Sequence, residues 1–481
     1  MNALLSLLAS VLEYVVIFGG TLLFLLNALV TGHILLNKDN TRAATGWIGL
    51  IWFSPLAGHV LYFLLGINRI ERKARRKYGT DHADTTPLDK HILNEGDERV
   101  NPSSLARIIH RVSGRELTDG NRITPLVNGD EAYPEMLEVI QNSERSITLC
   151  SYIFDNDAVG DRFVSALGDA VDRNVSVRVL IDDVGARHSF PSVSRKLTNR
   201  DVPVAHFMET WFPWKFRYLN LRNHRKIMVA DGTIGFTGGL NISGEYQLNE
   251  PGESARDLHF RVEGPVVNHL QNTFSEDWAF ATGEELEGEP WYTDIQRAGD
   301  VPARGIAAGP DETYDNLRMA FLGALSSAEA SVQIITPYFL PDDELISAIH
   351  LASLRSVDVE IFLPEENNPR LVQWASSATL EHVLKYDCDV YETPPPFDHS
   401  KLLVVDDRWV TFGSTNWDPR SLKLNFEFNV ECYDRELATE LQPLFDDRRA
   451  EENQLTLDQL QNRALITRLR DRAVRLLSPY L

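Results

Sequence analysis

Two stretches of this sequence carry histidine, lysine and asparagine at matching positions. They read HRKIMVADGTIGFTGGLN (224–241) and HSKLLVVDDRWVTFGSTN (399–416). In a strand, residues two apart share a face, so each His-x-Lys pair would present both side chains together. Imidazole can attack phosphorus or transfer a proton, and lysine offers a compact positive charge to phosphate. Two such sets meeting face to face would suit phosphodiester chemistry.

The candidate site residues follow from this pattern. Lysine and asparagine would bind the phosphate, and the small pairs Gly238-Gly239 and Gly413-Ser414 would let a ligand approach the backbone closely. The two motif aspartates lie seven residues after their histidines, which is the opposite face of a regular strand, so a structural turn role is the preferred interpretation for them. The full candidate set is His224, Lys226, Asp231, Asn241, His399, Lys401, Asp406 and Asn416.

The elements that must position these residues also occur twice. SITLCSYIFDND (146–157) corresponds to SVQIITPYFLPDD (331–343), and VSVRVLIDD (175–183) corresponds to VDVEIFLPE (357–365). Apolar strand-like runs alternate with helical stretches such as 161–173 and 343–354, which indicates a sheet covered by helices. We therefore expect an α/β fold with two pseudo-symmetric domains, 101–300 and 301–481, joined near 299–313.

The N-terminus differs from the rest of the chain. Residues 15–36 and 47–67 contain no charged side chain, and each run is close to the ~20 residues that cross a bilayer. A pair of buried core helices is the alternative, but the short polar connector favours a two-helix transmembrane hairpin over residues 1–67. Basic residues in 68–100, a juxtamembrane segment and linker, outnumber those of the connector and predict that the following domains face the cytoplasm. The basic cluster is Arg69, Arg72, Lys73, Arg75, Arg76 and Lys77.

Composition excludes several classes of protein. The net charge of −22 argues against a general nucleic-acid binder, which carries a basic footprint. Cys150, Cys388 and Cys432 are widely spaced and form no ligand cluster, so neither a disulfide framework nor a metal site is expected. No cofactor is expected.

Both motif copies match HxKxxxxD followed by GG or GS and then xN, and this pattern resembles the phospholipase D superfamily. TPYFLPDD (336–343), GSTNWDPRS (413–421) and the N-terminal spans are similar to bacterial-type cardiolipin synthases. The resemblance covers nearly the whole chain. It implies two phospholipase D-like domains, each a mixed sheet flanked by helices, after the transmembrane hairpin.

The resemblance also implies roles for residues. His224 would attack phosphorus to give a phosphatidyl-histidine, and His399 would act as general acid and base, although exchanging the two roles leaves the sequence argument unchanged. Asp257 and Glu427 match acidic positions that would orient the histidines, and ordinary surface or interdomain carboxylates are an equal alternative. Glu245, Arg256 and Arg420 are weaker candidates.

The implied activity is a phosphatidyl transfer in the cell membrane, by a multi-pass protein with cytoplasmic catalytic domains. Two phosphatidylglycerol molecules would give cardiolipin and glycerol, with the bilayer as the other partner. A phospholipase D using water, a transferase using another alcohol, a membrane-tethered nuclease and a non-catalytic scaffold are the alternatives. The oligomeric state stays open.

Two further stretches concern the membrane. Aromatic residues interleave with basic ones in 206–226, which predicts contact with the bilayer interface or, alternatively, a loop that completes the core. These aromatics are Phe207, Trp211, Phe212, Trp214, Phe216 and Tyr218. Residues 457–481 are amphipathic and arginine-rich, and they either lie on anionic lipid or close the second domain.

Overall fold

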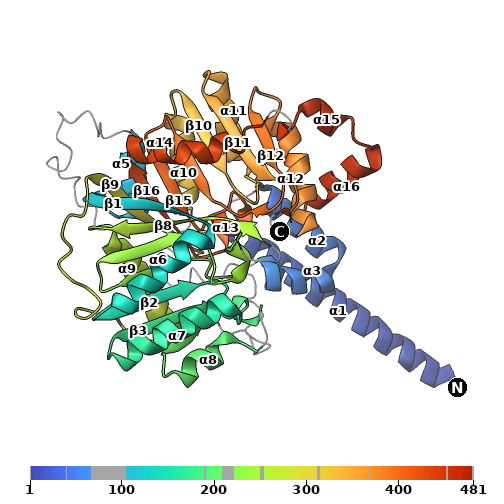
Figure 1. Cartoon of the computed structure of the whole chain (residues 1–481). Helices are drawn as coiled ribbons and strands as arrows, with labels where there is room; N and C mark the ends of the chain where they lie inside the picture. Colours follow the sequence, from blue (N-terminus) through green and yellow to red (C-terminus); the bar gives the residue numbers. More distant parts are fainter. Residues whose placement is uncertain are drawn as a thin grey trace. The chain divides into compact units, whose positions relative to one another are not determined.

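A computed structural model describes residues 2–38, 41–66, 104–188, 191–208, 221–249, 254–310, 315–367, 369–450 and 453–478. The chain divides into two compact units, Met1–Lys73 and Ala74–Leu481. Figure 1 labels the elements of both. The basic cluster and linker expected at 68–100 lie outside the described residues.

The N-terminal unit is helical. It consists of α1 (Asn2–Asn37), α2 (Thr41–Phe53), α3 (Pro55–Leu61) and the short π-helical turn η1 (Tyr62–Gly66). Within α1, the stretch Val16–Asn37 is 22 residues long and apolar enough to cross a membrane. The first predicted span is therefore present as one continuous helix.

The second apolar run, predicted as a span over 47–67, is not one continuous helix. It breaks between Phe53 and Pro55, because proline has no N–H to donate and its fixed φ suits the first turn of a new helix. Gly58 lets α3 pass close to α2, since a Cβ at Gly58 would lie 2.8 Å from Cα of Ile51. The run is thus two short helices joined by a sharp bend.

The end of this run packs against both α1 and α2. The hydroxyl of Tyr62 lies 2.9 Å from Nδ1 of His33, and the rings of Trp47 and Tyr62 have centroids 5.4 Å apart. Ile34, Ala44, Ile51 and Tyr62 form a small apolar cluster. The bend is therefore held by packing within the N-terminal unit.

The second unit is an α/β fold. Its strands are β1 (Thr118–Val127), β2 (Ser146–Ser151), β3 (Ser176–Asp182), β4 (Val204–Phe207), β5 (Ile227–Ala230), β6 (Ile234–Gly238), β7 (Ala255–Arg256), β8 (Leu258–Glu263), β9 (Val301–Ala308), β10 (Ser331–Ile335), β11 (Asp358–Pro364), β12 (Asp389–Thr393), β13 (Phe397–Asp398), β14 (Leu402–Val405), β15 (Trp409–Gly413) and β16 (Glu427–Tyr433). Its helices are α5 (Ser104–Ser113), α6 (Asn128–Asn142), α7 (Ala158–Asp172), α8 (Val193–Asn199), α9 (Val267–Thr282), α10 (Asn316–Ser327), α11 (Asp343–Leu354), α12 (Arg370–Val383), α13 (Pro419–Lys423), α14 (Arg435–Asp446), α15 (Leu457–Gln461) and α16 (Leu465–Arg475), with short 3-10 turns η2 (Gly185–Arg187) and η4 (Gly244–Tyr246).

One sheet of 14 strands runs through both halves of this unit, in the order β12-β11-β10-β14-β15-β16-β9-β1-β8-β6-β5-β2-β3-β4. Outward from the antiparallel contact between β9 and β1, the two halves contribute equivalent strands in the same order. Strands β2, β3 and β4 are parallel, as are β10, β11 and β12, whereas the inner strands are antiparallel. The mixed sheet and the repeat predicted from the sequence are confirmed, and the expected joint at 299–313 contains the central strand β9.

Equivalent sequence signals start equivalent helices in the two halves. Asp157 caps α7 by accepting a hydrogen bond from the N–H of Gly160, and Asp342 caps α11 by accepting one from Leu345. Both aspartates follow the first buried strand of their half, in IFDND and FLPDD. This local chemistry explains why the helical stretches predicted from the sequence begin where they do.

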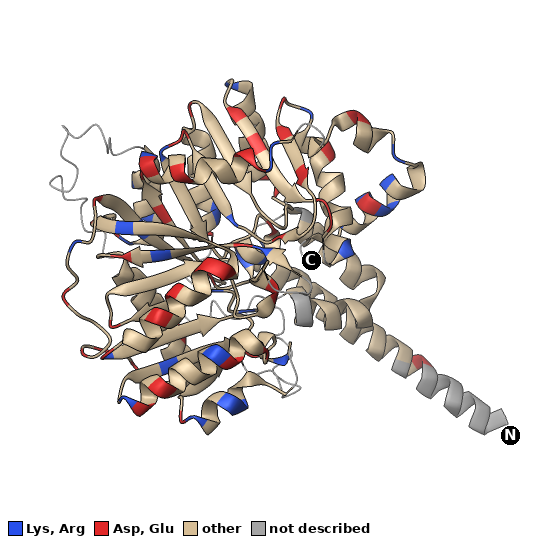
Figure 2. Ribbon diagram, viewed as in Figure 1, with Lys and Arg blue, Asp and Glu red and all other residues tan. Residues whose placement is uncertain are grey.

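The two halves meet through packed apolar side chains. Phe260 on β8 stacks on Phe412 on β15, with ring centroids 3.6 Å apart. Figure 1 shows helices flanking the strands, and Figure 2 shows acidic and basic residues interspersed over the helices and strands of the unit. The rigid seam between the halves is what brings the two motifs together.

Candidate active site

Each histidine–lysine pair lies just before the first strand of a buried hairpin. His224 and Lys226 precede β5, which pairs with β6, and His399 and Lys401 precede β14, which pairs with β15. The ammonium of Lys226 donates to the carbonyl oxygen of His224 at 2.7 Å, and Lys401 makes the same contact with His399. Each lysine is therefore held beside its own histidine, as the alternation argument predicts.

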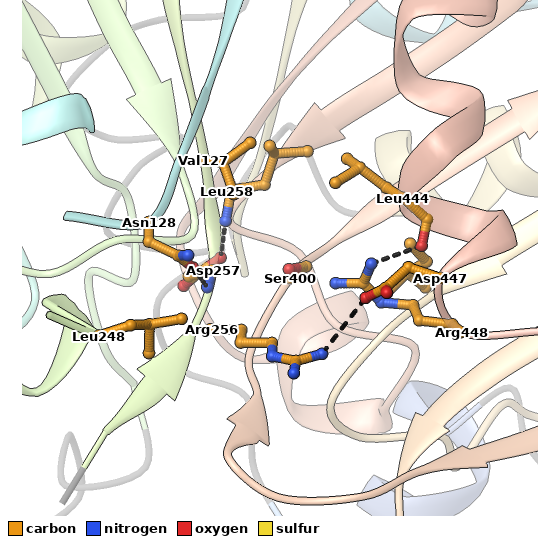
Figure 3. Close-up of a pocket in the computed structure, with 11 residues that line it drawn as sticks. Val127, Asn128, Leu248, Arg256, Asp257, Leu258, Ser400, Leu444, Asp447 and Arg448 are labelled. Atoms are coloured by element: carbon orange, nitrogen blue, oxygen red, sulfur yellow. Dashed lines mark hydrogen bonds and ion pairs between the residues drawn. The ribbon is translucent and has the colours of Figure 1, made fainter. Parts of the chain in front are cut away.

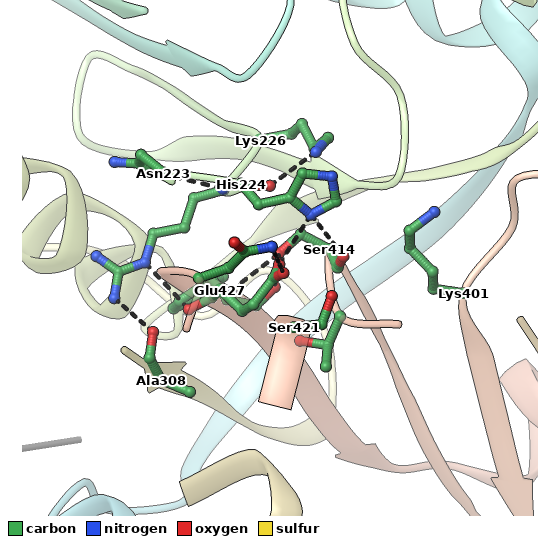
Figure 4. Close-up of polar contacts among 12 residues, drawn as sticks. Asn223, His224, Lys226, Ala308, Lys401, Ser414, Ser421 and Glu427 are labelled. Carbon is green, nitrogen blue, oxygen red and sulfur yellow. Dashed lines mark hydrogen bonds and ion pairs between the residues drawn. The ribbon is translucent and has the colours of Figure 1, made fainter. Parts of the chain in front are cut away.

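The first motif histidine is positioned by the second half of the unit (Figure 4). Nδ1 of His224 lies 3.1 Å from Oε2 of Glu427 and 3.1 Å from the carbonyl oxygen of Ser414. Its backbone N–H donates to the carbonyl oxygen of Phe426, the residue before Glu427, at 2.9 Å. Backbone and side chain together fix the imidazole.

The second motif histidine is positioned in the same way by the first half. Nδ1 of His399 lies 2.7 Å from Oδ2 of Asp257, and its backbone N–H donates to the carbonyl oxygen of Arg256 at 2.7 Å. The two acids that the sequence analysis weighed evenly against ordinary carboxylates thus each contact a motif histidine. The contacts are crossed, so neither half holds a complete histidine–acid pair by itself.

A hydrogen-bonded shell surrounds Glu427. The hydroxyl of Ser414 donates to its Oε2 at 2.5 Å, and the amide of Asn425 donates to Oε1 at 3.2 Å. Burial alone would raise the pKa of Glu427, but the neighbouring His224 and Lys226 and the Ser414 hydroxyl hold it below its usual range. Glu427 is therefore a stable anion facing the imidazole.

The first half has glycine where the second has Ser414. A Cβ at Gly239 would lie 2.1 Å from Oδ1 of Asp257, so only glycine leaves room for this carboxylate. The sequence analysis treated both positions only as small residues near a ligand. The difference between GG and GS in the two motifs was the available signal that they serve different acids.

The site is buried, and its two lysines face two carboxylates. Burial lowers the pKa of Lys226 to about 7 and that of Lys401 to about 8. The carboxylates of Glu427 and Asp257 counter part of this change, because they stabilise the charged form of each lysine. Repulsion by Lys401 further lowers the pKa of Lys226. Burial also lowers the pKa of His224, and it lowers that of His399 to about 4. Such a cluster favours the entry of an anion.

The two motif asparagines are not equivalent. Oδ1 of Asn241 accepts from the N–H of Ile153, and its amide donates to the hydroxyl of Tyr246, both at 3.2 Å. Asn416 is buried as well, yet its Oδ1 has no hydrogen-bond partner within the described part of the chain. Because the unpartnered atom is an acceptor oxygen, only the Nδ2 group of either asparagine could donate to a phosphate oxygen.

The motif aspartates lie at the turn end of each hairpin, away from the histidines. Asp231 accepts hydrogen bonds from the backbone N–H groups of Glu144, Arg145 and Ser146, at 2.8–3.0 Å for the shortest contact with each. Asp406 does the same for residues 329–331. Each carboxylate joins the turn to the start of β2 or β10, which is the turn role preferred from the sequence for these two candidate residues.

Arg225, between the first His and Lys, was missed by the sequence analysis. It points to the opposite face and donates to the carbonyl oxygen of Glu427 at 3.0 Å, to Asp277 at 2.6 Å and to the carbonyl oxygen of Ala308 at 3.1 Å. A charged residue at a position that alternation places in the core was the available signal. Arg225 ties the first motif to the strand that carries Glu427.

Aromatic rings border both imidazoles. The ring of Tyr152 has its centroid 5.2 Å from that of His224 and 5.5 Å from Nζ of Lys226. Tyr246, Tyr338 and Phe397 surround His399, with centroids 6.0–6.5 Å from its ring. These rings separate the charged centre from bulk water, which strengthens its electrostatic interactions.

A cavity of about 240 Å³ lies beside the Asp257 end of the site, and its lining includes Asp257, Ser400 and Leu248 (Figure 3). Arg256, a weaker candidate, borders it and forms an ion pair with Asp447 at 3.6 Å. Burial raises the pKa of Glu245, and Arg420 opposes the burial-driven rise in the pKa of Tyr152. Neither Glu245 nor Arg420 makes an ion pair with another described residue.

The predicted interfacial aromatic patch lies largely outside the described residues, which omit 209–220. Phe207 is described and is a core residue, packed against Phe280 and Phe426 with centroids 5.2 and 5.1 Å away. For this residue the alternative, a ring that completes the core, is correct.

The described ranges contain no group of three or more His, Cys, Asp or Glu side chains arranged to hold a metal ion. The three cysteines are free and buried.

A mixed sheet built from two equivalent halves, with one His-x-Lys motif from each half at a shared site, defines a phospholipase D-like protein. The family model described as "Cardiolipin synthase, PLD-like domain" matches residues 136–278 and 321–449, and "Phospholipase_D-nuclease N-terminal" matches residues 25–66. The chain belongs to the family of cardiolipin synthases with phospholipase D-like domains.

Individual relatives agree with the family. The chain is 30% identical to a cardiolipin synthase of Staphylococcus aureus, over 95% of both chains. It is 32% identical to a cardiolipin synthase of Halalkalibacterium halodurans, over 92% of this chain and 90% of the relative. The crystal structure of phosphatidylserine synthase from Haemophilus influenzae has the same fold, with a TM-score of 0.58 at 14% identity, covering 78% of this chain and all of that one.

Proposed function

We propose that this protein is a cardiolipin synthase, which transfers a phosphatidyl group from one phosphatidylglycerol to a second and releases glycerol. The crossed contacts His224–Glu427 and His399–Asp257 carry the proposal, because they place two oriented imidazoles and two lysines at one buried site. The full-length similarity to cardiolipin synthases supports this choice of substrate.

Binding is the first task of the site. The ammonium groups of Lys226 and Lys401, with the amide of Asn416, hold the non-bridging oxygens of the phosphodiester. An anion between the two lysines raises their lowered pKa values, so both become fully charged when substrate is bound. This preorganised charge stabilises the additional negative charge of the transition state.

Chemistry then proceeds in two displacements. Nε2 of His224 attacks phosphorus and forms a phosphatidyl-histidine while the P–O bond to glycerol breaks. The bound anion raises the lowered pKa of His399, so that this histidine carries a proton and gives it to the leaving oxygen. The hydroxyl of the second phosphatidylglycerol then loses its proton to His399 and attacks phosphorus, and His224 leaves. Glu427 and Asp257 hold the Nδ1–H of each ring, which directs Nε2 toward the substrate.

The assignment of His224 as nucleophile rests on the family resemblance, since both histidines have equivalent partners. The reaction is stopped rapidly during turnover without acid, the protein is digested, and the modified peptide is identified by mass spectrometry. The adduct is expected on the peptide containing residue 224, and an adduct on residue 399 would exchange the two roles.

The activity test uses the full-length protein in phosphatidylglycerol vesicles with a chelator and no added metal. Cardiolipin and glycerol in equal amounts are the expected products by mass spectrometry. Phosphatidic acid alone would establish a phospholipase D, and a new lipid formed only after adding serine or another alcohol would establish a different transferase. Cleavage of an oligonucleotide without change in the lipid would establish a nuclease.

Matched histidine variants make this test specific. His224→Ala and His399→Ala are each expected to abolish product. His110→Ala should retain activity, because His110 lies on α5 and its ring bonds to the carbonyl oxygen of Arg115. Full activity in either motif variant would overturn the mechanism.

We place the protein in the cell membrane as a multi-pass protein, with both catalytic halves on the cytoplasmic side. The length of the two apolar runs and the basic residues that follow them support this topology. A single crossing by α1 is a second candidate, because the bend at Pro55 returns Tyr62 to His33.

Labelling separates the two topologies. Asn2→Cys and Ser104→Cys are compared with a membrane-impermeant maleimide in vesicles of known orientation; the native cysteines are buried and provide little background. Protection of both sites from the outside supports two crossings, and labelling of residue 2 alone supports one.

A further inference from the structure

The C-terminal helix α16 presents its apolar side chains outward. Leu465, Ile466 and Leu469 on the helix, and Leu476 and Leu477 just after it, are all exposed, with values of 70% for Leu465, 75% for Ile466 and 80% for Leu476. Their spacing of three, four and seven residues places them on one side of the helix. In an ordinary amphipathic helix this side would face the core.

The arginines of the same segment turn toward the protein. Arg468 and Arg472 contact Glu381 on α12 at 3.4 and 2.7 Å. Arg463 and Arg470 contact the buried Asp471 at 3.2 and 2.7 Å. The pairs with Glu381 join the helix to α12, where Arg470 also lies over the ring of Trp374, and the apolar side is left free of the described core.

A patch of this kind needs an explanation. Five large apolar side chains on one short segment exceed the scattered single residues that a soluble surface usually exposes. The sequence analysis left two possibilities for this segment, contact with lipid or closure of the second domain. The structure divides them between the two sides of one helix, with the arginine side attached to the domain and the leucine side exposed.

We propose that the outward side of α16, defined by Leu465, Ile466, Leu469, Leu476 and Leu477, inserts into the interfacial region of an anionic bilayer. Charge favours this occupant: residues 463–475 contain five arginines and one aspartate, in a chain of net charge −22. The aspartate is buried, so α16 presents no exposed carboxylate to the membrane. Arg470 and Arg472 remain paired with Asp471 and Glu381, so the leucines of the outward side are the groups that enter the acyl region.

The position of α16 connects this surface to the site. Val474, on the inner side of α16, packs with Leu340, Val372 and Tyr338. The ring of Tyr338 lies in edge contact with His399, with centroids 6.5 Å apart. Insertion of α16 would therefore hold this part of the second half at the lipid surface near His399, and this consequence rests on the proposed function.

The chain offers a matched control surface. Leu351 and Leu354 on α11 are also exposed, at 60% and 65%, but they form only a pair, and α11 begins with Asp343 and Glu344. A label at residue 354 reports proximity to the membrane without the leucine side of α16.

The experiment uses the full-length protein in vesicles of phosphatidylglycerol and phosphatidylethanolamine, with Ile466→Cys or Leu354→Cys carrying an environment-sensitive fluorophore. Nitroxides on the acyl chains are expected to quench the label at residue 466 about threefold more strongly than that at residue 354. Equal quenching at both positions, or none at either, would overturn the proposal. Quenching measures how deeply the label enters the bilayer and requires no catalytic turnover, so this result is independent of the proposed activity.

Two other occupants give distinct results. Disulfide formation between Ile466→Cys residues of two copies would show a dimer face, and protection from aqueous iodide without nitroxide quenching would show a cover formed by another part of the chain. Either result overturns the proposal.

Activity assays with the double variant Leu465→Ser/Leu469→Ser give a second test. On a short-chain monomeric substrate its activity should equal that of the unmodified protein, whereas its activity on vesicles should fall about tenfold. The pair Leu351→Ser/Leu354→Ser should change neither, and a tenfold loss on both substrates for the α16 variant would contradict interfacial docking.

Discussion

Nδ1 of His399 lies 2.7 Å from Oδ2 of Asp257, a residue 142 positions earlier in the chain, and the backbone N–H of His399 donates to the residue before that aspartate. His224 has the same relationship with Glu427 and Phe426. The active centre is therefore completed only when the two halves are joined along β1 and β9.

The acids are expected to act through their histidines. Asp257→Asn and Glu427→Gln should each lower kcat by about a hundred- to ten-thousand-fold with little change in KM, because an amide no longer fixes the Nδ1–H tautomer. Steady-state kinetics on vesicles measure this.

A double variant is the control for that prediction. Asp257→Asn combined with His399→Ala should be no slower than His399→Ala alone, since the carboxylate acts only through the imidazole. Fully additive losses would contradict this coupling.

The motif aspartates are expected to affect stability rather than chemistry. Asp231→Asn and Asp406→Asn each replace a carboxylate that accepts three backbone N–H groups, and each should lower the free energy of unfolding by about 1–3 kcal/mol. Thermal unfolding measures the loss, and activity per folded molecule should be unchanged. Asp407→Asn, next in the chain and exposed, is the control; a kcat defect in the folded Asp231 or Asp406 variant would return these residues to the catalytic set.

Arg225 is expected to be essential for assembly of the site. Arg225→Met leaves Asp277 without its ion-pair partner in a buried position, which should cost about 3–5 kcal/mol of stability. Arg261→Met, which removes a partly exposed pair with Glu135, should cost about 1 kcal/mol or less. Equal melting temperatures for the two variants would show that Arg225 does not anchor the motif.

The lysines are expected to set the alkaline limb of the pH profile. A lowered pKa means that each ammonium loses its charge at lower pH than an ordinary lysine, so kcat/KM should fall as the pH rises between 7 and 8. The alkaline limb of the kcat profile should lie at higher pH than that of kcat/KM, because bound phosphate stabilises the ammonium. Lys226→Arg should move the kcat/KM limb upward, toward the pKa of Lys401, and an unmoved limb would assign it to an imidazole instead.

The sequence by itself determined the parts of this protein that depend on neighbouring residues. Alternation predicted that His224 lies beside Lys226 and His399 beside Lys401, and the repeated strand and helix signals predicted the mixed α/β fold. Apolar length predicted the long apolar helix within α1. These features follow from local backbone geometry, in which each residue's environment is set by those two to four positions away.

Only the tertiary structure decided the rest. His224 and Glu427 are 203 positions apart, and their contact depends on how one half packs against the other. The same is true of the partners of Arg225, the different engagement of Asn241 and Asn416, and the outward side of α16. Periodicity shows that a helix or strand has two unlike sides, but the side that meets the protein is settled by the charges and volumes of distant elements.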